Sequence, residues 1–197
     1  MLIHHPHIIY LHGFLSSPLS QKAQDMAAWM EQQGLQHYFH CPQLPMHPNE
    51  AGVLLHGLFF KLAHEDICVV GSSLGGFFAT WAAETFGCRV VLINPAVHPY
   101  QRINEYLGPQ KNYQTGEIHM IDPCFSEQLQ AFERRPSKFE RYWLLTQTGD
   151  EVLDYQAGVN FYSGCRQTII EGGNHGFVDF EPWLPEIWRF AQGKSLV

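Results

Sequence analysis

Short apolar runs alternate with amphipathic segments along the chain, and this alternation predicts its secondary structure. The apolar runs predict strands at 8–11, 37–39, 67–70, 90–93, 142–146 and 167–170. Helical spacing predicts helices at 21–33, 50–63, 73–86, 155–162 and 182–191. Because strands and helices alternate, we expect an α/β fold, a doubly wound and mostly parallel sheet of about six strands with helices on both faces.

The stretch 99–141 departs from this alternation. It contains several Gly and Pro residues and no clear strand, with one helix expected near 126–132. We therefore interpret it as an irregular insertion between two strand ends. Either it covers part of a site there, or it is a plain surface loop.

Composition and charge narrow the class of protein. A chain of 197 residues with 45% hydrophobic and 16% charged residues predicts one globular domain spanning 1–197. A net charge of −7 argues against nucleic acid and anionic membrane surfaces as partners. No apolar run is long enough to span a bilayer and no export signal is evident, so we expect a cytoplasmic protein.

Metal and disulfide signals are weak. The five cysteines are scattered, with no CxxC pair and no zinc spacing, so free thiols and no metal site are expected. His4, His5 and His7 cluster near the N-terminus, where a frayed polar segment is favoured over a metal site.

The strongest chemical motif is Gly71-x-Ser73-x-Gly75, which lies between a predicted strand and a predicted helix. A serine at a tight strand-to-helix turn exposes its hydroxyl, and side chains at the two glycine positions would collide across the turn. The pattern predicts a nucleophilic serine, Ser73. The alternative is an ordinary glycine-rich turn with no chemistry.

A serine nucleophile needs a base and a carboxylate that orients it, in the chain order Ser, acid, His. Asp150 follows the strand at 142–146 and is the expected acid, with Glu151 and Asp154 as competitors. Asp154 could instead cap the next helix. His175 follows the strand at 167–170, is flanked by glycines and is the expected general base. This chemistry needs no metal and no organic cofactor.

The oxyanion of such a reaction needs hydrogen-bond donors. We expect the backbone N–H of Leu74 and that of Phe14, because the first and third strands should be neighbours, with Gly13 allowing close approach of the substrate. His12 is interpreted as an orienting residue rather than a second base. The apolar side chains of Phe14, Leu15, Phe77 and Phe177 are candidate contacts for the acyl group.

Longer strings around these motifs, at 10–18, 70–76, 94–97, 147–155 and 170–175, resemble the YqiA/YcfP-type esterases of bacteria, within the α/β-hydrolase fold superfamily. The resemblance implies a small cytoplasmic serine esterase with Ser73, Asp150 and His175 as its triad. It also implies a small-molecule acyl ester or thioester substrate, with acyl-CoA among the candidates. The length leaves little room for a large cap domain. The alternative is a hydrolase-fold protein that binds a ligand or partner without turnover; the sequence leaves the oligomeric state open.

Overall fold

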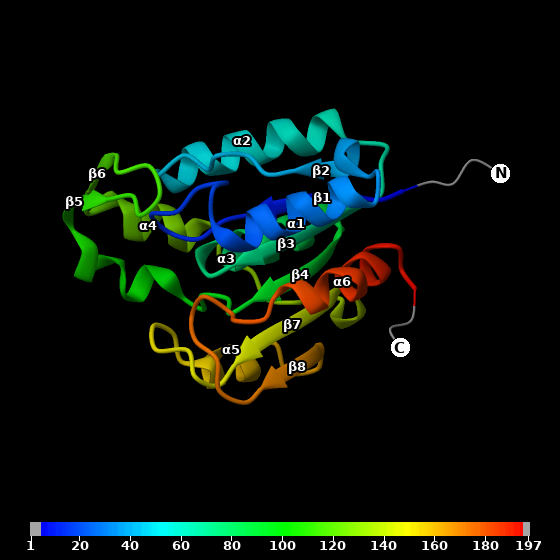
Figure 1. Cartoon of the computed structure of the whole chain (residues 1–197). Coiled ribbons are helices and arrows are strands. Elements are labelled where there is room, and N and C mark those ends of the chain that lie inside the picture. The colour runs from blue at the N-terminus through cyan, green and yellow to red at the C-terminus, as the bar shows by residue number, and fades with distance from the viewer. Residues whose placement is uncertain (1–4, 195–197) are drawn as a thin grey trace.

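The computed structural model describes residues 5–194 and places a six-stranded sheet between two layers of helices (Figure 1). The strands run in the order β2-β1-β3-β4-β7-β8, and each neighbouring pair is parallel. Their bounds are β1 (His7–Leu11), β2 (Phe39–His40), β3 (Ile67–Ser72), β4 (Arg89–Ile93), β7 (Tyr142–Gln147) and β8 (Arg166–Ile170). The expected parallel sheet is confirmed.

Helices cover both faces of this sheet because its strands are apolar on both sides. Helices α1 (Gln21–Gln32) and α6 (Leu184–Ala191), the latter entered through η5 (Glu181–Trp183), pack on one face. On the other face lie α2 (Pro48–Lys61), α3 (Leu74–Phe86) and α5 (Tyr155–Phe161). Successive side chains of β7 alternate between the two cores, with Leu144 in the core on the α3 side and Leu145 in the core on the α6 side.

The winding direction reverses between β1 and β3. The chain passes from β1 outward to β2 and then returns to β3, which pairs with β1 from His7 opposite Ile67 to Leu11 opposite Gly71. The neighbouring placement of the first and third strands is thereby confirmed. In open parallel sheets, ligands bind at the carboxyl ends of strands beside such a reversal.

The insertion is more regular than its sequence predicts. It contains the antiparallel hairpin β5 (Gly108–Lys111) and β6 (Ile118–Ile121), then helix α4 (Cys124–Ala131), besides the short turns η2 (Pro99–Gln101), η3 (Ile103–Tyr106) and η4 (Phe139–Arg141). The expectation of no strand was wrong, because the hairpin is half exposed and β5 has no apolar run. Its turn is closed by the Asn112 side chain, which accepts hydrogen bonds from the N–H groups of Gln114 and Thr115.

Two further expectations change near the N-terminus. The predicted strand at 37–39 is mostly the turn η1 (Gln36–Tyr38), and β2 begins only at Phe39. His4 lies outside the described residues, whereas His7 belongs to β1 and its Nδ1 lies 2.8 Å from His40 Nε2. The ring of His5 packs against Tyr38, with 5.2 Å between ring centroids. For these two histidines the expectation of a frayed end was wrong.

Two simpler findings concern membranes and thiols. Within residues 5–194, no helix has both the length and the apolar character that crossing a bilayer requires. All five cysteines are free thiols.

Candidate active site

Ser73 lies at the turn between β3 and α3 in a strained backbone conformation, with φ 54° and ψ −122°. Three backbone hydrogen bonds hold it there. Its N–H donates to the Ile93 carbonyl at 3.0 Å, and its carbonyl accepts from Gly76 at 2.9 Å and Ala96 at 3.0 Å. Because neighbouring elements fix both sides of the turn, the Ser73 side chain is held at the carboxyl edge of the sheet.

The glycines of the motif are required for two different reasons. A Cβ at Gly71 would overlap the carbonyl of Gly75, which is the collision across the turn that the sequence predicts. A Cβ at Gly75 would instead overlap the carbonyl of Leu11, at the end of the neighbouring strand β1. Gly75 therefore lets α3 pack directly against the loop that follows β1.

We expect Gly75→Ala to destabilise the fold by about 3 kcal/mol, because the added methyl group meets backbone rather than a movable side chain. Gly57→Ala is the matched control. Gly57 lies inside α2 with nothing within 4 Å of an added Cβ, and alanine there should stabilise by about 0.5–1 kcal/mol. Urea unfolding of both variants measures the difference; equal effects would contradict the packing argument.

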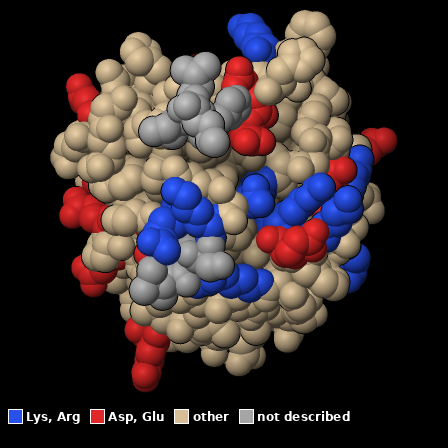
Figure 2. Space-filling model, turned by 90° about the vertical axis from the view of Figure 1, so that its right-hand side faces the viewer, with Lys and Arg blue, Asp and Glu red and all other residues tan. Residues whose placement is uncertain are grey.

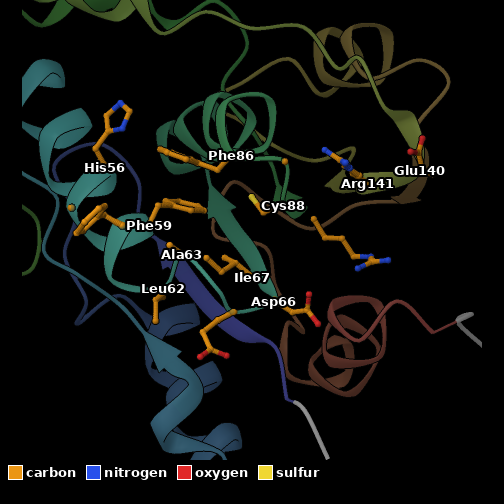
Figure 3. Close-up of a pocket in the computed structure, with 15 residues that line it drawn as sticks. His56, Phe59, Leu62, Ala63, Asp66, Ile67, Phe86, Cys88, Glu140 and Arg141 are labelled. Carbon is orange, nitrogen blue, oxygen red and sulfur yellow. The ribbon is translucent and has the colours of Figure 1, made fainter.

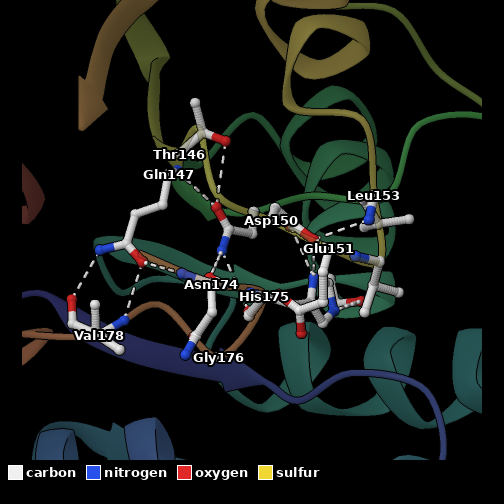
Figure 4. A network of polar contacts seen from close by, with 12 residues as sticks. Thr146, Gln147, Asp150, Glu151, Leu153, Asn174, His175, Gly176 and Val178 are labelled. Carbon is white, nitrogen blue, oxygen red and sulfur yellow. Dashed lines mark hydrogen bonds and ion pairs between the residues drawn. The ribbon is translucent and has the colours of Figure 1, made fainter. Parts of the chain in front are cut away.

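His175 joins Ser73 to Asp150. His175 Nε2 lies 3.1 Å from Ser73 Oγ. On the other side of the ring, Nδ1 lies 2.8 Å from Oδ2 and 3.0 Å from Oδ1 of Asp150 (Figure 4). A carboxylate that accepts the Nδ1 proton leaves Nε2 free to accept the serine proton. The structure thus brings together the three side chains that the sequence nominates.

The Asp150 side chain is 1% exposed yet remains suited to carry charge. Burial alone raises the pKa of this carboxyl, but hydrogen bonds from His175 and from the N–H groups of Leu153 and Val152 outweigh it. The resulting pKa lies below the ordinary value. Asp150 is therefore ionised at neutral pH beside the imidazole.

The two competing carboxylates have other partners. Glu151 accepts a hydrogen bond from the backbone N–H of His175 at 2.9 Å and does not contact the ring (Figure 4). Asp154 accepts from the N–H of Gln156 and caps α5, the alternative that the sequence analysis weighed. Only Asp150, of these three, bonds to the imidazole.

Two buried amides that sequence reasoning missed hold the His175 loop in place. Gln147, at the end of β7, accepts from the N–H groups of Asn174 and Val178 and donates to the Val178 carbonyl (Figure 4). Asn94, after β4, donates to the carbonyls of Asn174 and His175. The available signal was a polar side chain at the end of each apolar strand.

The loop after β1 lies directly against Ser73. A Cβ added to Gly13 would lie 3.2 Å from Ser73 Cβ, so a larger residue would crowd the nucleophile. Leu74 is the first residue of α3, and its N–H therefore has no acceptor within the helix. Gly13, Phe14 and Leu74 all line the cavity above Ser73.

His12 orients this loop. Its buried ring lies with Nδ1 3.0 Å from the Gly13 carbonyl, while Nε2 accepts a hydrogen bond from the Leu44 N–H at 3.0 Å. Since the carbonyl and N–H of one trans peptide point in opposite directions, the bond to Gly13 turns the Phe14 N–H away from His12. The geometry favours the orienting role over a second base.

Burial lowers the pKa of His12 below its ordinary 6.5, against the opposing effect of the Gly13 hydrogen bond. The unfolded chain therefore takes up this proton at a higher pH than the folded protein does. Stability should fall as pH drops below 6.5, with a slope of at most about 1.4 kcal/mol per pH unit from this residue. Urea unfolding as a function of pH should show a shallower slope for His12→Gln, and an unchanged slope would contradict the assignment.

Ser73 and His175 open into a cavity of about 490 Å³ at the carboxyl edge. Its apolar wall includes Phe14, Val97 from the loop that follows β4, and the insertion residues Ile103 and Tyr106. The insertion therefore covers part of the site, the first of the two roles considered.

The other candidate acyl contacts do not line this cavity. Leu15, Phe77 and Phe177 are 2%, 5% and 2% exposed, and Phe77 and Phe177 belong to the two hydrophobic cores of the sheet. They were chosen because they lie next to the catalytic motifs in the sequence, but their side chains are buried inside the protein. For these three residues the expectation was wrong.

The residues 7–192 match the model of the uncharacterised protein family UPF0227. The chain belongs to this family. The match confirms the resemblance drawn from the sequence motifs, since it runs through the Gly71-x-Ser73-x-Gly75 turn, the Asp150 loop and the His175 loop.

Solved structures show the α/β-hydrolase fold of this UPF0227 chain. Est1E from Butyrivibrio proteoclasticus superposes with a TM-score of 0.70 at 14% identity, over 96% of this chain and 88% of that one. Mouse alpha/beta hydrolase domain-containing protein 10 gives 0.68 at 17% identity, over 95% and 88%. A structure from the metagenome-derived lipolytic enzymes LipS and LipT gives 0.67 at 14% identity, over 96% and 94%.

Among its described residues, the UPF0227 chain has a cluster of possible metal ligands, His47, Asp122 and Cys124, whose ligand atoms lie within 4.8 Å of one another. None of the three lines the Ser73 cavity. Asp122 also accepts a hydrogen bond from the Cys124 N–H at 2.9 Å, so it helps to start α4.

A larger cavity of about 910 Å³ lies at the amino ends of the strands (Figure 3). Phe59 and Phe86 stack on its wall beside Arg89 and Arg141. Figure 2 shows that this face of the molecule carries basic and acidic side chains side by side. The larger cavity is lined by neither Ser73 nor His175. The smaller cavity is therefore the candidate active site of this UPF0227 protein.

Proposed function

We propose that this UPF0227 protein is a serine hydrolase of carboxylic esters or thioesters, acting as a single cytoplasmic domain. The observation that supports this most is the unbroken contact from Ser73 through His175 to Asp150. Similar folds include enzymes described as lipolytic and an Est1E structure with bound ferulic acid. Free thiols in all five cysteines agree with a reducing compartment.

The reaction follows from which groups of the site can donate and accept a proton. Ser73 Oγ attacks the substrate carbonyl while its proton passes to His175 Nε2, and Asp150 stabilises the imidazolium. The N–H groups of Phe14 and Leu74 hold the oxyanion. His175 then gives the proton to the departing alcohol or thiol, leaving an acyl group on Ser73. Water, deprotonated by His175, releases the acid and restores the serine.

The cavity sets the range of substrates. Its volume of about 490 Å³ and its contacts from Phe14, Ile103 and Tyr106 suit short or flexible acyl chains. Acyl-CoA thioesters remain candidates through the family resemblance, and simple esters through the lipolytic neighbours.

Labelling with a fluorophosphonate tests the proposal directly. The wild-type protein should form one phosphonyl adduct on the peptide that contains Ser73, because only an activated serine attacks the phosphorus. Ser73→Ala should lose the adduct, and Ser72→Ala, its neighbour in sequence, should retain it. An unlabelled wild-type protein would instead support the alternative of a fold that binds without turnover.

A further inference from the structure

Two buried hydroxyl groups beside the catalytic serine have no hydrogen-bond partner among the described residues, Tyr10 Oη and Ser20 Oγ. Both residues line the active-site cavity, and the Tyr10 side chain is 0% exposed. The Tyr10 hydroxyl lies close enough to the Ser20 and Ser72 side chains to feel both of them, but it meets hydrogen-bond geometry with neither. Because an unpaired buried hydroxyl is unfavourable, both groups are expected to bond to something that enters the cavity.

Helix α1 begins at the same place. Ser20 is its N-cap residue, but the Ser20 hydroxyl makes no capping hydrogen bond and the first turn contains no acidic residue. The N–H groups of Gln21, Lys22 and Ala23 therefore have no acceptor within the helix. These groups, with the positive end of the dipole of a 12-residue helix, form a favourable environment for an anion.

The positively charged side chain of Lys22 lies at this end of the cavity. Lys22 lines the wall, and its ammonium donates to the Gly176 carbonyl at 2.6 Å, next to His175. Arg102 lines the part of the cavity wall that the insertion forms. Its guanidinium is paired there with Glu105. No Asp or Glu among the described residues lines the cavity, although the chain has a net charge of −7. Behind the cavity wall, Asp25 of α1 and Asp150 act on the Lys22 ammonium, and Asp25 accepts a hydrogen bond from the Gln21 side chain at 2.7 Å.

We propose that Tyr10, Ser20 and Lys22, with the amino end of α1, form an anion-binding subsite for substrates that carry a carboxylate or phosphate group. The selection of substrates rests on the proposed hydrolase function; the binding of the anion does not. The anion accepts hydrogen bonds from the two hydroxyls and from the helix N–H groups, and Lys22 balances its charge. Its distance from the ester along the substrate is set by the gap between α1 and Ser73.

The source of the anion is decided by two matched pairs of esters. One pair has an acyl chain that ends in a carboxylate or in a carboxamide. The other has an alcohol that bears a phosphate or a hydroxyl. The ratio of kcat/KM within a pair should favour the charged member by about tenfold or more, for the acyl pair or the alcohol pair according to which part enters the subsite. Ratios near one in both pairs would overturn the selection.

Variants assign the preference to these residues. Tyr10→Phe and Lys22→Met should each reduce the charged-to-neutral ratio about tenfold. Lys61→Met, at the exposed end of α2 and off the cavity wall, is the matched control and should keep the ratio. A Lys22 that served only to fasten the Gly176 loop would change both members of a pair equally, which would contradict the proposal.

Calorimetric titration with inorganic phosphate and with glutarate separates the subsite from the hydrolase function. Binding to the wild-type protein and its loss in Tyr10→Phe would support the subsite even in a protein that cleaves no ester. Tyr10→Phe removes an unpaired hydroxyl, so its melting temperature should not fall, and lost binding cannot then be ascribed to unfolding. Hydrolysis of neutral esters with no binding of either anion would overturn the subsite and leave the proposed function standing.

Discussion

Replacement of Ser73 by alanine should lower kcat for an activated short-chain ester by about 10³- to 10⁶-fold. The variant loses the Ser73 hydroxyl, which lies 3.1 Å from His175 Nε2 and, within residues 5–194, is the only hydroxyl hydrogen-bonded to it. The remaining oxyanion donors and the cavity still bind the ester, so KM should change far less than kcat. Steady-state kinetics with a chromogenic ester measures both constants.

A second substitution at the same position excludes misfolding as the cause. Because Ser73 has φ 54°, glycine relieves backbone strain that alanine retains. Ser73→Gly should therefore be as inactive as Ser73→Ala but no less stable than the wild-type protein. Near-normal turnover by either variant would reject the assignment of the nucleophile.

Asp150→Asn should lower kcat by about 10³- to 10⁴-fold while the fold is retained. The asparagine amide can donate to His175 Nδ1, which forces the proton onto Nε2, and a protonated Nε2 cannot accept the proton of Ser73. Steady-state kinetics with a chromogenic ester measures the loss, and circular dichroism checks that the fold is kept.

The neighbouring carboxylates provide matched controls for this substitution. Glu151→Gln keeps an oxygen that accepts from the His175 N–H, and Asp154→Asn keeps a cap on α5. Each should reduce kcat by less than about tenfold, because neither side chain contacts the imidazole. An effect of Glu151→Gln as large as that of Asp150→Asn would show that the acid has been assigned to the wrong residue.

The sequence predicted the residues whose role is set by position along the chain. Each of Ser73, Asp150 and His175 lies in the turn or loop that follows a strand, and parallel strands bring their carboxyl ends to one edge. The contacts between these side chains follow from that topology. The reason why position 75 must be glycine could not be predicted in this way, because the backbone that excludes a side chain there is that of Leu11, about sixty residues earlier in the chain.

Features that depend on three-dimensional packing could not be predicted from the sequence. Leu15 and Phe177 adjoin the motifs, yet their side chains are buried away from the cavity, and no local pattern distinguishes the two directions. The hairpin was missed because β5, Gly108–Lys111, carries no apolar alternation and most side chains of both strands are exposed or half exposed. The role of Asn94 depends on a loop eighty residues later in the chain.

The insertion that walls the cavity is joined to the loop after β1 by two hydrogen bonds, from Asn112 to the Ser16 carbonyl and from the Tyr113 N–H to the Leu15 carbonyl. The catalytic side chains lie at the carboxyl edge of the sheet, while much of the surface that would contact the acyl chain belongs to the insertion. Substitutions in the hairpin can therefore change which molecules are accepted without disturbing the reacting atoms. Within the family, preference should diverge faster than chemistry, and grafting this segment between members is a direct route to new selectivity.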